Sequence, residues 1–594
     1  MCGIVGYIGD KPTAEVLLKG IKNLEYRGYD SAGIAIANQD KIQIIKEVGK
    51  VSKLQDKLEK EKLITSSFGI AHTRWATNGE VSLKNTHPHN VGKVTLVHNG
   101  IVENADKLKE KLLKKDYLFK SKTDTEVVAA LLDNYLKTKS EIKALVATLK
   151  QLEGSFALVI MIEGKDYLYA VRNKSPLVIG SEKDEKYIAS DIPAIAEFTK
   201  NYILLDDLEI AKVVKDKVEV YDRDGNKVER KAKKIDVTNE IIDKQGYEHF
   251  MLKEIMEEPR VLQNLLDIYL ERLDDLDISR YDSVHIVACG SAMYAGMIGK
   301  VLLEEKANIN VTVEVASEYR YKKSIYRDNS LIILISQSGE TADTIAALRI
   351  AKANHQDTLA IINTKNSTIA READKTLYIE AGVEVAVATT KAYILQVALL
   401  SLMAYVTAKK KSLLDVDESI EVINHFKAMP GLIQRVLKDN ELYKKIAKQL
   451  YKHDNIFFIG RKMDYAICLE GSLKLKEISY IHSEAYPAGE LKHGTISLID
   501  KGLPVIAIVT DKKLKDKMVS NIKECEARYA KMFIITSEDV DEKDAVKVTV
   551  KKTDIFTQTL VVVPILQMIA YNVALLRGCD IDKPKNLAKS VTVE

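Results

Sequence analysis

The sequence predicts a protein of several domains, in which a layered α+β domain is followed by two tandem doubly wound α/β domains. Three observations predict this architecture. Strand-like runs dominate residues 1–230, whereas helices alternate with short apolar strands from about residue 250 onward. The second of these regions also contains an internal repeat.

Length, composition and charge are those of an ordinary folded protein. A chain of 594 residues is too long for one hydrophobic core, so roughly three or four domains are expected. Lysine and arginine total 88 against 85 acidic residues, and this small excess argues against nucleic acid or an anionic membrane as partner. Five cysteines without a CxxC pair indicate neither a metal site nor a disulfide framework, so a cytoplasmic location is expected.

Two apolar stretches, 394–408 and 560–576, approach the length of a membrane span. Gln, Ser, Pro or Asn interrupts each of them, so we expect buried core helices instead. The start of the chain lacks the basic region and apolar run of a secretory signal.

The first domain is expected to be rich in sheet. Runs such as "CGIVGYIG", "SAGIAIAN" and "VTLVHNG" predict strands, and residues 123–137 and 141–152 predict helices between them. Residues 225–250 are charged and weakly periodic, which makes them the best candidate for a linker.

The rest of the chain contains short, fully apolar strands such as "VHIVACG" and "LIILIS". Strands of this kind are typical of parallel sheets that are covered on both faces. "VHIVACGSAMYA" (284–295) aligns with "IFFIGRKMDYA" (456–466), "ASEYR" (316–320) resembles "HSEAY" (482–486), and "ILQ" recurs at 394 and 565. These matches predict two doubly wound α/β domains in tandem.

One turn in the first copy has the composition of an anion site. "LIILISQSGETADT" runs from a strand through Ser336, Gln337, Ser338 and Gly339 into a helix, with Thr341 at its start. Backbone N–H groups and hydroxyls at a helix N-terminus bind phosphate, although the same residues are also usual helix caps. Ser291 follows a neighbouring strand, at the edge where open α/β sheets bind ligands.

The nature of the anion and the fate of the second copy follow from neighbouring residues. The turn lacks the lysine and aspartate that a nucleotide and its magnesium ion require, so a sugar phosphate is expected. The corresponding turn of the second copy, "AIVTDKKLKD", has lost the serines.

The second copy carries a set of charged residues instead. Glu470, Lys474 and Glu477 share one helix face, and His493 follows in a glycine-flanked loop. Solvated ion pairs are the common reason for such spacing. Beside a sugar-phosphate pocket, however, they would supply the acid and base of aldose–ketose chemistry.

Cys2 lies directly behind the initiator methionine in "MCGIVGY". A cysteine in an apolar run is often a plain core residue. Alternatively, removal of Met1 would give one residue both a thiol and a free α-amine.

The motifs resemble a known family over the whole chain, from residue 2 to residue 594. "CGIVGYIG", "HTRWATNG", "LVHNGIVEN" and "TDTEV" resemble N-terminal-nucleophile glutamine amidotransferase domains. "SQSGETADT", "EGSLKLKEISYIHSEAYPAGELKHG" and "NLAKSVTVE" resemble paired sugar-isomerase (SIS) domains. Their combination is similar to the glutamine–fructose-6-phosphate aminotransferase (isomerizing) family.

This resemblance implies an amidotransferase domain over 2–218, a linker with a connecting helix over 219–273, and SIS domains over 274–414 and 446–584. Residues 585–594 would form a tail that carries the catalytic lysine. The implied reaction converts fructose 6-phosphate and glutamine into glucosamine 6-phosphate and glutamate, the first step of UDP-N-acetylglucosamine synthesis.

At the glutamine site, the resemblance makes Cys2 the nucleophile and its own α-amine the base. Asn99 and Gly100 would form the oxyanion hole. Arg74, Thr77 and Asp124 would bind the α-groups of glutamine, and Trp75 would gate an internal ammonia channel.

At the sugar site, the phosphate would bind Ser291, Ser336, Gln337, Ser338 and Thr341. The resemblance implies that His493 opens the ring, that Lys589 forms an imine with C2, and that Glu477 moves a proton between C1 and C2. Lys474 is included in this catalytic group. In the family the histidine reaches the neighbouring subunit, which implies a homodimer, and no metal or organic cofactor is expected.

Three residues depart from the family pattern. Asn78 replaces a usual histidine, Ala292 a frequent serine, and Thr495 a common proline. The first departure concerns the glutamine loop, and the other two concern the sugar site.

Two other functions would use part of these motifs. A phosphoribosyl amidotransferase shares the first domain but needs an acidic pyrophosphate-binding motif, and the duplicated second half argues against it. A sugar-phosphate-binding regulatory protein would have no use for Cys2 or Lys589.

Overall fold

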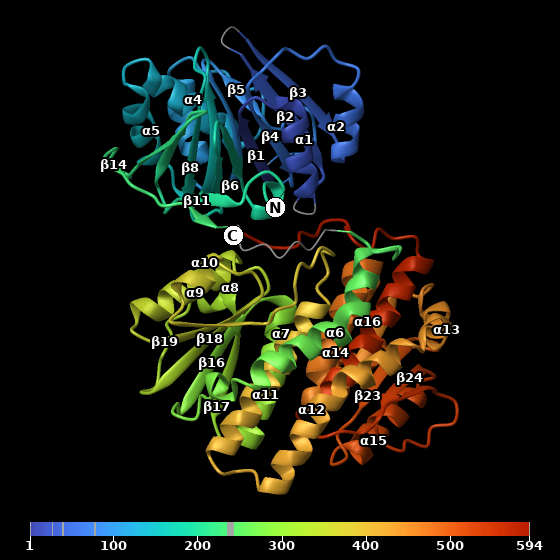
Figure 1. Ribbon diagram of the computed structural model, residues 1–594. Coiled ribbons are helices and arrows are strands. Elements are labelled where there is room, and N and C mark those ends of the chain that lie inside the picture. The colour runs from blue at the N-terminus through green and yellow to red at the C-terminus, as the bar shows by residue number, and fades with distance from the viewer. Residues whose placement is uncertain (1, 26–27, 39–40, 77–78, 235–242, 593–594) are drawn as a thin grey trace. The chain divides into compact units, whose positions relative to one another are not determined.

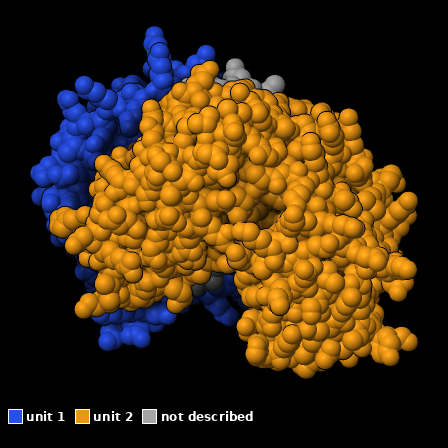
Figure 2. Space-filling view, turned by 90° about the horizontal axis from the view of Figure 1, so that it is seen from below, with its two compact units in different colours: residues 1–240, 590–594 blue, residues 241–589 orange. Residues whose placement is uncertain are grey.

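The protein is described as a computed structural model over residues 2–25, 28–38, 41–76, 79–234 and 243–592. The chain divides into two compact units, 1–240 with 590–594, and 241–589 (Figure 2).

The first unit is built on two antiparallel sheets, in which the order of the strands differs from their order along the chain (Figure 1). One sheet has the order β15-β11-β9-β10-β1-β4-β2-β3, and the other has the order β14-β13-β12-β8-β7-β6-β5. The strands of the first sheet are β1 (Gly3–Ile8), β2 (Ser31–Ala37), β3 (Ile42–Val48), β4 (Phe68–Arg74), β9 (Val178–Glu182), β10 (Glu185–Ala189), β11 (Asn201–Leu204) and β15 (Lys233–Lys234). Those of the second are β5 (His89–Val91), β6 (Val94–Val102), β7 (Gly154–Ile162), β8 (Leu168–Asn173), β12 (Ile210–Val213), β13 (Val218–Tyr221) and β14 (Lys227–Val228).

Helices cover the outer faces of both sheets, so the unit has four layers. The helices are α1 (Thr13–Asn23), α2 (Val51–Leu58), α3 (Ala105–Leu113), α4 (Asp124–Leu136), α5 (Glu141–Leu149) and the short 3-10 helix η2 (Ile192–Ala194). The residues of β1 show why the layers form. Ile4 and Ile8 face the second sheet, whereas Val5 and Tyr7 pack under α1, and all four are buried. The layered α+β fold is therefore confirmed.

The first unit continues past residue 218, where the sequence-based boundary was placed. Val218 begins β13, which pairs with β12, and β15 pairs with β11 through Lys234 opposite Asn201. Exposed edge strands carry charged side chains. This explains why the segment has the composition of a linker although part of it lies in the sheets.

The second unit contains two five-stranded parallel sheets. The first has the order β17-β16-β18-β19-β20 and the second β22-β21-β23-β24-β25, so each copy repeats the same topology. Their strands are β16 (Ser283–Ala288), β17 (Asn310–Val315), β18 (Ser330–Ser336), β19 (Asp357–Ile362), β20 (Lys375–Tyr378), β21 (Asn455–Gly460), β22 (His482–Pro487), β23 (Pro504–Val509), β24 (Lys531–Thr536) and β25 (Val546–Thr549). The tandem doubly wound architecture is confirmed.

One repeat match is wrong in its detail. Ser317 lies in α8, whereas Ser483 lies in β22, so "ASEYR" and "HSEAY" are not equivalent positions. Strand β17 is the counterpart of β22 by its place in the sheet. The other two matches do pair equivalent elements. The match at 284 relates β16 and α7 to β21 and α14, and the match at 394 relates α11 to α16.

Long helices between the two sheets form a common core (Figure 1). The helices of this unit are α6 (Phe250–Leu270), η3 (Leu273–Leu276), α7 (Gly290–Ala307), α8 (Ala316–Tyr319), α9 (Ala342–Ala353), α10 (Thr368–Glu372), α11 (Lys391–Lys410), α12 (Val416–Leu437), α13 (Asn440–Leu450), α14 (Met463–Ser479), η4 (Ala488–His493), η5 (Thr495–Leu498), α15 (Lys515–Glu526) and α16 (Gln558–Leu576). Helices α11 and α16 are long and apolar enough to cross a membrane, but nearly all their side chains are buried in this core. They pack as the core helices that the sequence predicts.

Candidate active site

Strand pairing brings Cys2 to the end of β4. Gly3 lies opposite Thr73, so the thiol reaches the residues that follow this strand. Trp75 donates its backbone N–H to Cys2 Sγ at 3.2 Å, and the thiol lies 3.4 Å from the Trp75 carbonyl oxygen. Burial raises the pKa of the Cys2 thiol, while the Trp75 N–H and the Arg74 charge lower it.

The "HNG" segment of β6 faces Cys2. Asn99 donates from Nδ2 to the Cys2 carbonyl oxygen at 2.9 Å. Gly100 has a φ of +119°, and a Cβ atom there would lie 2.0 Å from the Ser155 carbonyl oxygen. Only glycine fits this position, which explains the residue that follows Asn99.

Arg74 and Asp124 flank the same thiol and shift its pKa in opposite directions. Arg74 ends β4 and donates to the carbonyl oxygen of Gly79 at 3.1 Å. Asp124 begins α4, where its carboxylate accepts the Val102 N–H at 2.8 Å. Thr77 and Asn78 lie outside the described residues.

Four buried histidines surround this site, and the sequence analysis gave them no role. They are His72, His87, His89 and His98. The His72 and His87 rings stack with their centroids 4.1 Å apart, and those of His87 and His89 lie 4.9 Å apart. Burial lowers the pKa of all four, so each ring is neutral near pH 7.

The serine-rich turn closes on itself at the carboxyl end of β18. Ser336 Oγ lies 2.9 Å from Thr341 Oγ1 and accepts the Gly339 N–H at 3.0 Å. Gly339 has a φ of +64°, and a Cβ atom there would lie 1.9 Å from Ser367 Oγ. In the described chain the Thr341 side chain does not cap α9, so simple N-capping does not account for the turn.

The charged residues of α14 are buried rather than solvated. Lys474 Nζ lies 2.5 Å from Glu477 and 3.5 Å from Glu470, and the Lys474 side chain is 1% exposed. Burial raises the pKa of Glu470 to about 7, although the charge of Lys474 opposes this. Ser291 lies in the first turn of α7, so the serine edge of the first sheet meets α14.

Lys589 forms a buried ion pair with Glu384, with side chains 5% and 0% exposed. The Glu384 carboxylate also accepts the backbone N–H groups of Thr390 and Ala392, each at 3.0 Å, at the start of α11. Lys589 and these N–H groups lower the pKa of Glu384 against the effect of burial. The charge of Glu384 also raises the pKa of Lys474.

Glu384 is a site residue that sequence reasoning missed. It stands in the loop after β20, 205 positions from the lysine that it pairs with. The available signal was a single carboxylate in the otherwise apolar or hydroxylated run "VEVAVATT".

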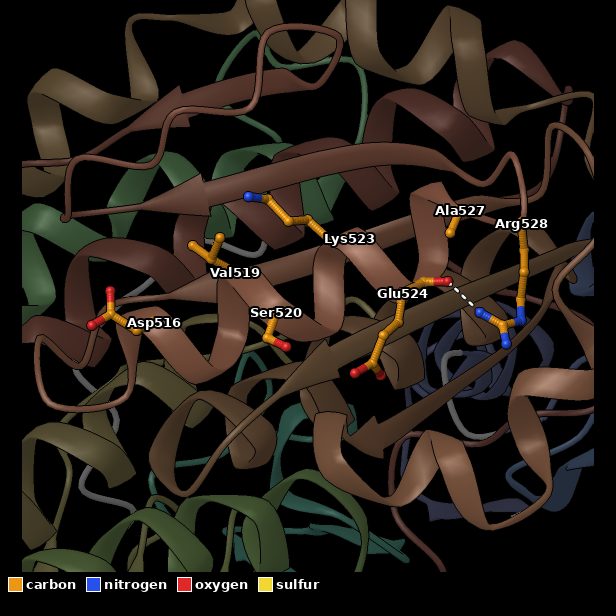
Figure 3. Close-up of a pocket in the computed structure, with 7 residues that line it drawn as sticks. All are labelled: Asp516, Val519, Ser520, Lys523, Glu524, Ala527 and Arg528. Carbon is orange, nitrogen blue, oxygen red and sulfur yellow. Dashed lines mark hydrogen bonds between the residues drawn. The ribbon is translucent and has the colours of Figure 1, made fainter.

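His493 is the predicted sugar-site residue that this chain does not bring to the group. It is exposed at the end of η4, and within the described residues it makes no hydrogen bond or ion pair. The surface depression drawn in Figure 3 is also separate, because it is lined by residues of α15 and by Ala527 and Arg528, which follow that helix, and by none of the predicted site residues.

Comparisons with known proteins identify domains in both units. A glutamine amidotransferase domain model matches residues 79–197, and a SIS domain model matches twice, at 277–406 and 449–577. Over the full length of both proteins, the chain is 47% identical to a glutamine–fructose-6-phosphate aminotransferase (isomerizing) of Caldanaerobacter subterraneus subsp. tengcongensis. It is 46% identical, again over both full lengths, to the protein of that name from Clostridium tetani.

Among solved structures, the chain is similar to the C-terminal domain of glucosamine-fructose-6-phosphate aminotransferase from Francisella tularensis. The TM-score is 0.55 and the identity 36%, over 58% of this chain and all of that one. The two SIS matches confirm the duplication inferred from the sequence.

The neutral histidines predict that the first unit loses stability in acid. Each ring has a folded pKa below its unfolded value of about 6.5, so its contribution is present above pH 6.5 and is lost as the pH falls. Below that pH, we expect the free energy of unfolding to fall by about 1.4 kcal/mol per pH unit for each of His72, His87 and His89, whose pKa values lie well below 6.5. Trp75, the single tryptophan, lies in this unit, so denaturant titrations followed by its fluorescence measure the effect.

A matched variant checks the cause. His89→Gln is expected to reduce the slope of stability against pH by the contribution of one ring. A slope that is flat between pH 7 and 5 in the parent protein would contradict the neutral state assigned to the four rings.

Proposed function

The chain belongs to the family of glutamine–fructose-6-phosphate aminotransferases (isomerizing), and from this membership we propose how its residues divide the reaction. The protein converts fructose 6-phosphate and glutamine into glucosamine 6-phosphate and glutamate. The observation that carries the residue assignments is the presence of two built sites, one around Cys2 and one around Lys589. A regulatory protein without synthase activity is not favoured, since the full-length relatives are enzymes.

At the first site, Cys2 is the nucleophile for the carboxamide carbon of glutamine. After removal of Met1, the α-amine of Cys2 takes the thiol proton and passes it to the leaving ammonia. The negative oxygen of the tetrahedral intermediate is stabilised by Asn99 Nδ2 and the Gly100 N–H. Water then hydrolyses the thioester to glutamate, which releases the thiol.

Substrate binding at this site is assigned to charged residues of the same unit. Arg74 pairs with the α-carboxylate of glutamine and Asp124 with its α-ammonium group. Support comes from their opposite effects on the Cys2 thiol, since both must lie close to it. Thr77 is proposed to assist Arg74.

Ammonia must reach the sugar without entering bulk water, where it would become ammonium at pH 7 and could not attack a carbonyl. We assign the gate of an internal path to Trp75. Both its backbone N–H and its carbonyl oxygen contact Cys2 Sγ, so a displacement of Trp75 would change the contacts of the thiol.

At the second site, the serine turn and Ser291 bind the phosphate of the sugar. Gln337 is included because it continues the turn between the two serines. Its carbonyl oxygen accepts the N–H groups of Asn363 and Thr364, each at 3.2 Å, which fixes the turn against the next strand.

Lys589 adds to C2 of the open-chain ketose, and water leaves to form an imine. Ammonia then displaces the lysine, and Glu477 carries the proton from C1 to C2 to give the 2-amino aldose. Lys474 fixes the Glu477 carboxylate through its ion pair, and Glu384 holds Lys589 in the pocket.

Ring opening is assigned to His493 of a second copy of the chain. The exposed position of His493 supports this, because within one chain it contacts none of the sugar-site residues described above. We therefore propose a homodimer in which each sugar site is completed by its neighbour, working in the cytoplasm without a metal or organic cofactor.

The assignment of Cys2 predicts a selective loss. Cys2→Ala should abolish glutamine hydrolysis and glutamine-dependent synthesis, while calorimetric binding of fructose 6-phosphate is retained. Cys525→Ala removes another buried cysteine, on α15, and should leave both activities unchanged. Full synthesis by protein that mass spectrometry shows to retain Met1 would refute the role of the free α-amine.

Substitutions in the serine turn should have the reverse effect, a loss of sugar binding with glutamine hydrolysis retained. Ser336→Ala combined with Ser338→Ala should weaken fructose 6-phosphate binding by roughly 1–3 kcal/mol for each hydrogen bond lost to the phosphate. Glutamine hydrolysis should be unchanged, which serves as the control for folding. Parent-like sugar affinity in the double variant would place the phosphate elsewhere.

Lys589→Arg tests the imine. Guanidinium stays protonated and cannot condense with a ketone, so isomerisation and synthesis should be abolished while glutamine hydrolysis persists. Borohydride with fructose 6-phosphate should label Lys589 in the parent protein and nothing in the variant. Lys585→Arg, at an exposed lysine of the same tail, is the matched control. Synthesis at the parent rate in Lys589→Arg would rule the imine out.

A further inference from the structure

The two ends of the Asn99 amide have nearly the same shape but opposite hydrogen-bonding character. Only the NH₂ end can stabilise the oxyanion, so the orientation of this group decides whether the site works. We propose that His72 fixes that orientation and is a positioning residue for glutamine hydrolysis. The inference rests on the oxyanion role proposed for Asn99.

The His98 carbonyl identifies the protonated nitrogen of His72. His72 Nε2 lies 3.0 Å from the His98 carbonyl oxygen, which can only accept a hydrogen bond. Nε2 must therefore carry the proton. The same nitrogen lies 3.2 Å from Asn99 Oδ1, so this N–H faces the end of the amide that accepts.

The other end of the amide meets a second carbonyl. Asn99 Nδ2 lies 2.9 Å from the Cys2 carbonyl oxygen, which again can only accept. The His72 N–H and the Cys2 carbonyl thus both favour the same orientation of the Asn99 amide, one at each end of the group. A reversed amide would set donor against donor at His72 and acceptor against acceptor at Cys2, with its oxygen toward the developing charge.

The imidazole ring of His72 is itself held in place. It is 1% exposed on β4 and stacks on His87, whose Nε2 lies 3.2 Å from Thr125 Oγ1. Among the described residues His72 Nδ1 has no hydrogen-bond partner, so a second proton on this ring would be buried without an acceptor. Burial, with the nearby charge of Arg74, keeps the ring neutral by lowering its pKa to about 3.

A double-mutant cycle tests this assignment. His72→Leu should lower kcat for glutamine hydrolysis by about 10- to 100-fold. This loss should not exceed the loss caused by removing an oxyanion donor. KM for glutamine should stay within about threefold of the parent value. Because His72 acts through Asn99, His72→Leu should cause no further loss in an Asn99→Ala background. His72→Gln, which can still donate a hydrogen bond from its Nε2, should recover most of the rate.

The matched control is His89→Gln, which removes a buried imidazole of the same cluster that contacts Thr123 instead of Asn99. It should leave kcat within about threefold of the parent. Additive losses in the double variant, or an unchanged kcat in His72→Leu, would overturn the proposal. An unchanged kcat in Asn99→Ala would instead refute the oxyanion role of Asn99 itself, and with it the premise of the inference.

A second measurement needs no variant and so does not depend on folding. Nitrogen-15 NMR of the parent protein with labelled histidine should show His72 as the neutral tautomer protonated at Nε2 from pH 8 to pH 5. A ring protonated at Nδ1, or one that becomes charged in this range, would contradict the orientation argument.

Discussion

The buried ion pair between Lys589 and Glu384 is the contact on which the proposed sugar site depends. A lysine so close to the end of a chain is expected to be mobile, since termini fray. Here its charge is withdrawn from water, and breaking such a pair costs about 3–5 kcal/mol because the remaining charge is left uncompensated. Glu384 is in turn bound to the backbone at the start of α11, so the tail is tied to the core of the unit.

The two proposed sites differ in the charge state of their buried polar groups. Around Cys2 the histidines are neutral, so the glutamine site needs no counter-ions for them, and their hydrogen bonds serve to orient other groups. Around Lys589 the charges are kept and paired, as in Lys474 with Glu470 and Glu477. Neutral rings suit the positioning of an amide, whereas paired charges suit repeated proton transfer on a sugar.

Periodicity and local motifs predicted most of the fold, because β1, the strands of the parallel sheets and the serine turn are each encoded in a short, continuous stretch of sequence. The sequence boundary at 218 differs from the first compact unit, which extends to residue 240, because charged edge strands resemble a linker. Glu384 was missed because its partner lies in the C-terminal tail, and local pattern does not report such a contact. His72 lies in the recognisable motif "HTRW", but its proposed role depends on the carbonyl oxygen of His98 in another strand.

In the proposed reaction, the enzyme moves nitrogen from glutamine to the sugar without releasing it to water. A decisive experiment supplies amide-labelled [15N]glutamine with fructose 6-phosphate and an excess of unlabelled ammonium. We expect glucosamine 6-phosphate that carries the full label, formed in a one-to-one ratio with glutamate. Product diluted toward the isotope composition of the ammonium would contradict it.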